Sequence, residues 1–251
     1  MNFSDYFKQR RTVRRYSEKA VPAELLRDML EVAMQAPTTG GMQVYSAIVT
    51  TRADLKKALA PCHFNQPQVE QAPVVITFCA DFNRFVKWCE ASDAVPGYDN
   101  FQSFMTATLD AVIFAQQFNT IAEMNGLGCC YLGTTTYNAE EISRVLGLPA
   151  RVVPIVTLTV GYPADEPAMT ERIPVESVVH METYHDYTSA DIRAAYEAKE
   201  ALPVNQRYVK ENGKSSLAQV FTDVRYTREA NETFSAKFYD FIAEAGFMWP
   251  K

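Results

Sequence analysis

The sequence is poor in the side chains that ligate metal ions, and those present are not spaced for ligation. Its three histidines, His63, His180 and His185, and its five cysteines follow none of the intervals typical of metal sites. The cysteine count is odd, and the neighbouring pair Cys129 and Cys130 does not suit an ordinary disulfide. We therefore expect no metal site and predict buried thiols in a reducing compartment.

Long apolar runs are also missing. Residues 1–6 mix polar and aromatic side chains and lack the apolar stretch of a signal peptide. The longest candidate for a membrane span contains Asp110, Gln116 and Gln117. We expect a cytoplasmic protein without membrane segments. The formal net charge of −6 argues against general nucleic-acid binding, although a local basic patch could still bind one small anion.

The chain has no internal repeat and no low-complexity tract, and its composition is that of an ordinary globular protein. Its 251 residues suffice for one large domain or two small ones. Because helical and strand patterns alternate along the whole length, we predict a single α+β domain with a central sheet. The core would span residues 1–187, and residues 188–251 would form a helical C-terminal extension that packs on the core or on another subunit.

The apolar patterns place the elements of this domain. Helices are expected at residues 22–36, 54–59, 83–91, 101–124, 138–146, 190–202 and 231–245, and strands at residues 45–51, 74–79, 127–133 and 152–160. Asn138 and Glu141 form a capping pair at a helix start. Residues 61–72 are expected to be irregular, and residues 164–187 to wrap the surface. The helix at 101–124 is apolar nearly all round, which indicates a central helix or one covered by a partner subunit.

Against this acidic background, four arginines stand within six residues. They are Arg10, Arg11, Arg14 and Arg15, with Thr12 between them. The positive charges of such a cluster repel one another unless water or a bound anion reduces the repulsion. Guanidinium groups bind phosphate oxygens in pairs. A solvated charged segment is the alternative interpretation, and it is favoured for this string taken alone.

Two other features could meet the same ligand. At the end of an expected strand, Leu132 and Thr134 flank Gly133, which would let the backbone approach a flat ligand closely. Arg172 lies in an otherwise acidic segment near the C-terminus, where it could equally form a surface ion pair. A ligand whose phosphate binds the arginines and whose aromatic ring lies against the glycine would be a mononucleotide. Cys62 and His63 could contribute to a site, but two neighbours without other ligands are a weak indication.

These motifs resemble the FMN-dependent nitroreductase family, in the subgroup of flavin reductase P and the major oxygen-insensitive nitroreductase. The arginine-rich string matches the family's opening, and residues 36–43 (Ala-Pro-Thr-Thr-Gly-Gly-Met-Gln) resemble its Ala-Pro-Ser-Ser-x-Asn-x-Gln loop. Residues 131–134 resemble its Tyr-Ile-Gly-Gly element, and residues 163–184 resemble the subgroup's tail. The resemblance runs from about residue 8 to the C-terminus.

The resemblance implies a central mixed, mostly antiparallel sheet flanked by helices, and a homodimer with FMN at the interface. Arg10, Arg11 and Thr12 would then lie on the phosphate side, with Arg172 as a second phosphate anchor. Arg14 would reach the pyrimidine end of the isoalloxazine. The remaining implied cofactor contacts lie in three loops, and they are Pro37, Thr38, Thr39, Gly41, Gln66, Val69, Leu132, Gly133 and Thr134.

Three positions depart from the family pattern. The loop asparagine is Gly41, the second glycine of the Tyr-Ile-Gly-Gly element is Thr134, and a tail lysine is Thr170. Thr134 keeps a backbone donor but narrows the space over the ring. These departures indicate a substrate pocket that differs from those of the best-known members.

The implied function is an NADPH- or NADH-dependent oxidoreductase. It would transfer hydride through flavin N5 in a ping-pong cycle to a nitroaromatic, quinone or flavin acceptor. The sequence shows no nucleophile–base constellation, which fits an enzyme whose flavin carries the chemistry. The alternatives are a more specific reductive member of the family and a flavin-binding storage or sensing module. Arg225 is a weaker candidate for a nucleotide contact, and it could equally lie on a solvated helix face. Tyr98 is a weaker candidate for a substrate contact, and it could equally be a core aromatic.

Overall fold

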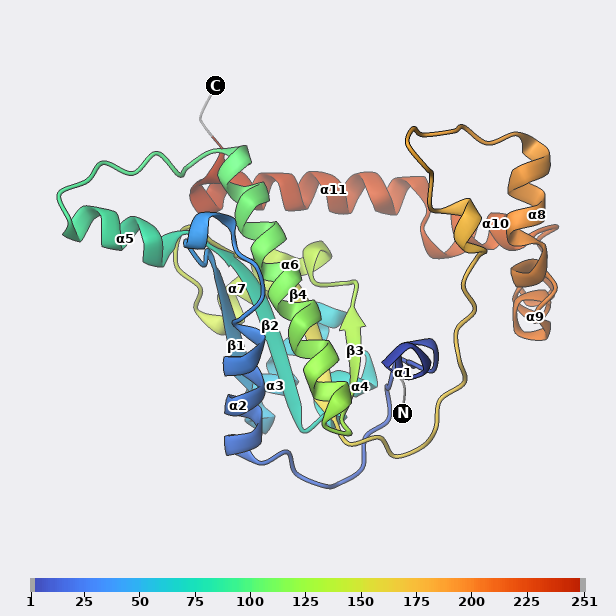
Figure 1. Cartoon of the computed structure of the whole chain (residues 1–251), viewed down its shortest axis with the longest axis horizontal. Helices are drawn as coiled ribbons and strands as arrows, with labels where there is room; N and C mark the ends of the chain where they lie inside the picture. Colours follow the sequence, from blue (N-terminus) through green and yellow to red (C-terminus); the bar gives the residue numbers. More distant parts are fainter. Residues whose placement is uncertain (1–2, 249–251) are drawn as a thin grey trace. The chain divides into compact units, whose positions relative to one another are not determined.

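The computed structural model describes residues 3–248 (Figure 1). Its internal contacts divide these residues into two units, which are described separately. The first consists of residues 3–168 and 234–248, and the second of residues 169–233.

A four-stranded sheet forms the centre of the first unit. Its strands are β1 (Tyr45–Thr50), β2 (Val74–Asp81), β3 (Gly128–Leu132) and β4 (Val152–Gly161), in the order β1-β2-β4-β3. All three pairings are antiparallel. Every residue of β2 is buried, as expected for a central strand that is covered on both faces.

One face of the sheet is covered by α6 (Phe101–Met124) and α2 (Ala23–Ala33), which pack against each other (Figure 1). α6 contacts all four strands. Phe114 and Phe118 of this helix meet the ring of Phe78 on β2, at centroid distances of 5.2 and 6.0 Å. These aromatic contacts fix α6 across the middle of the sheet.

Short helices cover the opposite face. They are α3 (Ala53–Leu59), η2 (Pro61–His63), α4 (Pro67–Gln71), η3 (Thr136–Asn138) and α7 (Ala139–Leu146). Their apolar side chains form a second buried cluster with Val75, Cys130 and Leu132 of the sheet. α7 ends at Gly147, whose φ of 65° is the left-handed conformation that glycine adopts readily.

The last part of the first unit is C-terminal in sequence. α11 (Arg228–Ile242) and η6 (Ala243–Phe247) carry Phe238, Ile242 and Phe247, which pack with Phe82 and Phe104. α5 (Asn83–Ala91) adds to this cluster through Val86, while α1 (Phe3–Lys8) precedes the arginine segment and η1 (Thr39–Gly41) lies before β1. The expectation that the C-terminal helix packs on the core is thus confirmed for residues 234–248.

The second unit is helical. It contains η4 (Val175–Ser177), α8 (Ser189–Glu200), α9 (Pro203–Glu211), α10 (Leu217–Val220) and η5 (Phe221–Arg225). Thr188 and Asp191 form a capping box at the start of α8. Since residues 234–248 belong with the first unit, the boundary between the units differs from the expected division at residue 188. The single-domain prediction stays a prediction.

The sequence patterns gave the major elements correctly, and the α+β class with a mostly antiparallel sheet is confirmed. Two local expectations are wrong. Residues 61–72 are not irregular but form η2 and α4, because Pro61 and Pro67 each begin a short helical turn. Asn138 does not cap α7, since its side chain instead donates to the Cys62 carbonyl and accepts from Lys237. Within residues 3–248, no helix has the length and hydropathy needed to cross a membrane.

Candidate functional site

The arginine segment lies beside the edge strand β3. The backbone N–H of Val13 donates to the Cys129 carbonyl at 3.1 Å, and the hydroxyl of Tyr16 lies 2.9 Å from the carbonyl oxygens of Val13 and Thr159. A Cβ on Gly128 would lie only 2.2 Å from a methyl carbon of Val13, so the close approach requires glycine there. These contacts fix the direction in which the arginines leave the backbone.

Three of the four arginines meet carboxylates. Arg10 Nε lies 3.1 Å from Glu123 Oε1, Arg11 pairs with Glu166, and Arg15 Nη1 lies 2.8 Å from Asp165 Oδ2. The Glu123 carboxyl is buried, and desolvation raises its pKa although Arg10 opposes the shift. The segment is therefore not entirely solvated, because Arg10 forms an ion pair with a buried acid.

A cavity of about 490 Å³ opens beside Arg10 and Arg11. The residues that line it include both arginines and also Glu123 and Glu166. Glu166 is largely exposed, with 78% of its side chain accessible. An anion arriving at Arg11 would replace this exposed carboxylate, whereas Arg10 would keep its buried partner.

Arg14 belongs to a different group of side chains. It is exposed, and its guanidinium acts electrostatically on the Cys130 thiol of β3. Burial raises the pKa of this thiol, and the charge of Arg14 opposes the increase. Gln68 donates through Nε2 to Gln66 Oε1 at 2.7 Å. The charge of Arg14 thus acts at Cys130 on the edge strand, while Gln66 and Gln68 are hydrogen-bonded to each other at the start of α4.

The turn after β3 offers backbone donors. Within residues 3–248, we find no acceptor for the N–H groups of Gly133 and Thr134. The turn is fixed from the other side, since Thr135 Oγ1 donates to the Leu132 carbonyl at 2.9 Å. Thr134 Oγ1 lies 2.8 Å from Nδ1 of His63. Two free, adjacent N–H groups suit the polar edge of a planar ring system.

The loop before β1 is organised by one buried acid. Asp110 of α6, only 2% exposed, accepts hydrogen bonds from both hydroxyls of Thr38 and Thr39 and from the Thr39 N–H. Thr38 Oγ1 also accepts from the Gln43 N–H at 3.0 Å. The two threonine side chains are thus engaged within this chain, while Pro37 and Gly41 are exposed. The loop offers a ligand or partner mainly its backbone and Pro37.

Three further candidate residues pack in the interior or against aromatic rings. Val69 is fully buried and Leu132 is 3% exposed, both in the apolar cluster beneath the turn. Their side chains support the neighbouring segments. Tyr98 stacks on Phe82, with centroids 5.0 Å apart and ring planes at 15°. Tyr98 is partly buried and so has the core-like character that was the alternative interpretation.

The remaining two candidates, Arg172 and Arg225, lie in the second unit. Arg172 is exposed and donates to the carbonyls of Thr170 and Glu171, without an ion pair among the described residues. The guanidinium of Arg225 lies 4.4 Å from the ring centroid of Tyr208, a cation–π contact.

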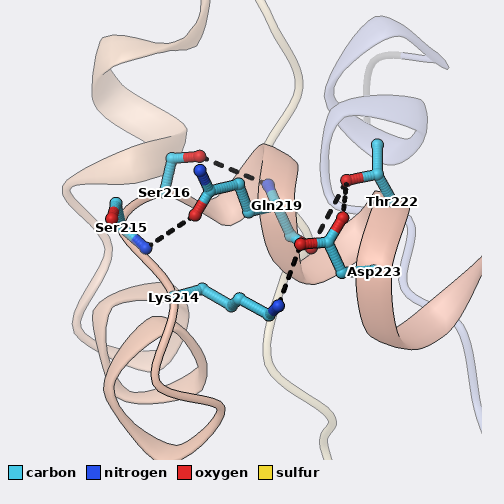
Figure 2. A network of polar contacts seen from close by, with 6 residues as sticks. All are labelled: Lys214, Ser215, Ser216, Gln219, Thr222 and Asp223. Carbon is cyan, nitrogen blue, oxygen red and sulfur yellow. Dashed lines mark hydrogen bonds and ion pairs between the residues drawn. The ribbon is translucent and has the colours of Figure 1, made fainter.

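A polar network fixes the segment that leads to Arg225 (Figure 2). Lys214 Nζ pairs with Asp223 Oδ2 at 2.9 Å, Ser216 caps α10 through the Gln219 N–H, and Gln219 Oε1 accepts from the Ser215 N–H. Arg225 therefore follows an ordered segment and rests on an aromatic ring.

The first unit thus places the segment with Arg14 beside β3, and it places Gly133 and Thr134 in the turn after this strand, where Thr134 contacts His63 of the segment that leads to Gln66. Sequence patterns missed Asp110, Gln68 and Cys130, and they gave only a weak indication for His63. An acid in the middle of the apolar helix at 101–124 was a signal for Asp110, since a buried carboxylate needs several donors. The neighbouring pair Cys62 and His63 was that indication, but the partner of His63, Thr134, lies too far along the chain to be read from spacing. Among residues 3–248 we find no group of three or more His, Cys, Asp or Glu side chains that could hold a metal ion.

Residues 7–162 match the sequence profile of the nitroreductase family. The chain belongs to this family. The FMN reductase [NAD(P)H] of Bacillus subtilis is 32% identical over 216 residues, which cover 82% of this chain and 83% of that protein. The profile match over residues 7–162 includes the arginine segment, the loop before β1 and the turn after β3.

Solved structures of relatives show the same fold. A crystallised protein from Bacteroides fragilis NCTC 9343 is 52% identical and superposes with a TM-score of 0.96, covering 98% of this chain and 100% of that chain. A nitroreductase from Bacillus subtilis superposes with a TM-score of 0.85 at 26% identity, covering 98% and 99%. The resemblance read from the motifs is therefore confirmed at the level of family and fold.

Proposed function

We propose that this nitroreductase-family protein is an FMN-dependent oxidoreductase that uses NADPH or NADH to reduce nitroaromatic, quinone or flavin acceptors. The family match and the FMN reductases among its relatives support the enzyme class and the cofactor. When bound, FMN would supply the redox chemistry by accepting hydride and passing the electrons on in a ping-pong cycle. No residue of the chain is assigned as a nucleophile or general base.

The observation that carries this proposal is the arrangement at the end of β3. The N–H groups of Gly133 and Thr134, which have no acceptor within residues 3–248, follow the same strand whose Cys129 carbonyl binds Val13 beside Arg14. A polar heterocycle with acceptors along one edge and negative charge in its reduced state fits such a site. Arg14 would provide a fixed cation for that charge, and the backbone donors would orient the ring. Gln66 would hydrogen-bond the ring or the ribityl chain.

On the phosphate side of the proposed site, Arg10 and Arg11 are already paired with carboxylates in this structure. Arg11 would exchange its exposed partner Glu166 for phosphate, with Thr12 as a further donor, while Arg10 stays beside Glu123. Arg172 would be the second phosphate anchor, and Arg225 a contact for the nucleotide. The substitution of Thr170 for the family's lysine leaves one fewer cation for phosphate in this chain.

We further propose that the protein is a cytoplasmic homodimer in which the partner helps to cover the cofactor. α6 exposes several large apolar side chains in the isolated chain, namely Phe101, Leu109, Val112, Ile113 and Met124. Such a face is unusual for a helix in water and favours a protein partner. Pro37 and Gly41 are exposed as well, so they are available to approach the cofactor bound by the second subunit.

The test is anaerobic reduction of the purified protein. The expected result is a yellow protein with the absorption spectrum of bound FMN, which bleaches rapidly when NADPH or NADH is added. A yellow protein that is never bleached by either nucleotide would contradict the enzyme and favour a flavin-binding module. A colourless protein that does not take up added FMN would contradict the cofactor assignment.

A further inference from the structure

The turn that follows β3 is tied to a buried histidine. Thr134 Oγ1 lies 2.8 Å from Nδ1 of His63, and no part of His63 is exposed to solvent. His63 comes from η2, more than seventy residues earlier in the chain. The second ring nitrogen, Nε2, is buried and has no hydrogen-bond partner among the described residues. The imidazole therefore makes a single polar contact, which is with Thr134.

This contact concerns a residue that departs from the family pattern. The resemblance places a glycine at position 134, where a side chain would narrow the space over a flat ligand. In this chain the hydroxyl of Thr134 is engaged by His63. The backbone of the same residue is also held, since its carbonyl accepts from the Tyr137 N–H at 3.2 Å. Thr134 is thus fixed at both its side chain and its carbonyl, while its N–H stays unpaired.

The direction of the hydrogen bond follows from the surroundings of His63. Burial lowers the pKa of the imidazole from 6.5 to about 4, so the ring is neutral near pH 7 and carries one N–H. A buried N–H without an acceptor costs more than an unused ring lone pair. The proton is therefore assigned to Nδ1, which donates to Thr134 Oγ1. The hydroxyl proton of Thr134 is then free to be donated elsewhere.

We propose that His63 is a positioning residue that orients Thr134 so that its hydroxyl donates a hydrogen bond to the bound cofactor. The acceptor would be a carbonyl oxygen or ring nitrogen on the edge that meets the Gly133 and Thr134 N–H groups. This inference rests on the proposed function, because it assumes a flavin at this turn. It adds a side-chain donor at a position where the family pattern provides only a backbone one.

Four variants of the FMN-loaded protein separate this role from simple packing. T134V removes the hydroxyl and keeps the shape of the side chain. H63L removes the Nδ1 donor and fills the buried volume, whereas H63N keeps an N–H near the position of Nδ1. The fourth variant combines H63L with T134V. T136V is the matched control, because Thr136 lies two residues further along and its hydroxyl has no hydrogen bond among the described residues.

The readouts are the dissociation constant of FMN and the visible absorption spectrum of the bound flavin. The loss of one neutral hydrogen bond predicts that T134V and H63L each weaken FMN binding about 5-fold and shift the flavin absorption bands. H63N and T136V should keep the wild-type spectrum. The double variant should show no larger effect than either single variant, because both remove the same hydrogen bond.

An unchanged affinity and spectrum in T134V would overturn the inference, and so would additive effects of H63L and T134V. T134V leaves the buried imidazole in place, so it decides the question even where H63L fails to fold. Failure of the wild-type protein to bind FMN would instead overturn the proposed function. If the wild-type protein binds FMN and T134V has the same affinity and spectrum, only the role of Thr134 is overturned.

Discussion

Thr39 donates twice to the same oxygen of Asp110, through its backbone N–H at 2.9 Å and through its hydroxyl at 3.0 Å. Asp110 also accepts from the Thr38 hydroxyl and, at 3.4 Å, from the Val44 N–H. A carboxylate in the middle of an apolar helix thereby fixes the loop that leads into β1. The hydrogen bonds explain why this helix tolerates a buried acid.

The first prediction concerns this acid. D110A leaves four donors without their acceptor, and we expect it to lower the free energy of unfolding by about 3 kcal/mol. T39V removes a single side-chain donor and should cost about 1 kcal/mol. Urea unfolding at equal protein concentration and equal FMN loading measures both values. A D110A variant as stable as the wild type would show that the loop does not depend on Asp110.

The second prediction concerns acid stability. The pKa of His63 is lowered to about 4 in the folded chain, against 6.5 for an ordinary histidine. Between these values the unfolded chain binds a proton that the folded chain does not. The stability contributed by neutral His63 is therefore complete above pH 6.5 and is lost as the pH falls toward 4, by up to about 3 kcal/mol in total.

Urea unfolding at several pH values between 7.5 and 4.5 tests this effect. H63N cannot titrate in this range, so its stability should fall less steeply with pH than that of the wild type. H185N removes an exposed histidine and should keep the wild-type slope. Equal slopes in H63N and the wild type would mean that His63 is not the group responsible.

The third prediction separates two adjacent arginines. R14A should weaken FMN binding about 10- to 100-fold, the range of a lost charge-assisted hydrogen bond, and should slow flavin reduction by NADPH or NADH. The reason is that the reduced ring would lose its counter-charge. R15A is the control, because Arg15 is 76% exposed and pairs with Asp165. FMN titration and stopped-flow reduction measure both variants. Equal behaviour of R14A and R15A would remove Arg14 from the site.

The fourth prediction concerns the contact between the arginine segment and β3. In G128A the new Cβ would lie 2.2 Å from Val13 Cγ2, so the segment must move away from the strand. We expect a loss of about 1–3 kcal/mol in the free energy of unfolding, together with weaker FMN binding. G97A is the control, since a Cβ at Gly97 would meet nothing within 4 Å. Wild-type stability and FMN affinity in G128A would show that Val13 does not need this approach.

The fifth prediction concerns assembly. I113E places a charge on the exposed apolar face of α6, and we expect it to shift the protein from dimer to monomer and to weaken FMN retention. V49E is the matched control, because Val49 is similarly exposed but lies on β1. Light scattering across a range of protein concentrations measures the oligomeric state. A wild-type protein that is monomeric throughout would contradict the proposed dimer.

Local patterns in the sequence were sufficient for most of the fold. The nearly continuous apolar runs at 74–79 and 152–160 indicated the two central strands, because a strand covered on both faces is apolar along most of its length. The glycine-terminated helix at 138–146 was also readable, since Gly147 has the left-handed conformation that its position implied. The predicted cap at Asn138 was wrong, because this side chain is instead hydrogen-bonded to Cys62 of η2 and Lys237 of α11.

By itself, the sequence determined the family, the α+β class, and the residues that form the arginine segment, the loop before β1 and the turn after β3. Only the tertiary structure decided which of these side chains remain available to a ligand. Asp110 engages Thr38 and Thr39, Glu123 holds Arg10, and His63 holds Thr134. The physical reason is that hydrogen bonds and charges act through space at a few ångströms. Partners more than seventy residues apart therefore leave no mark in local spacing.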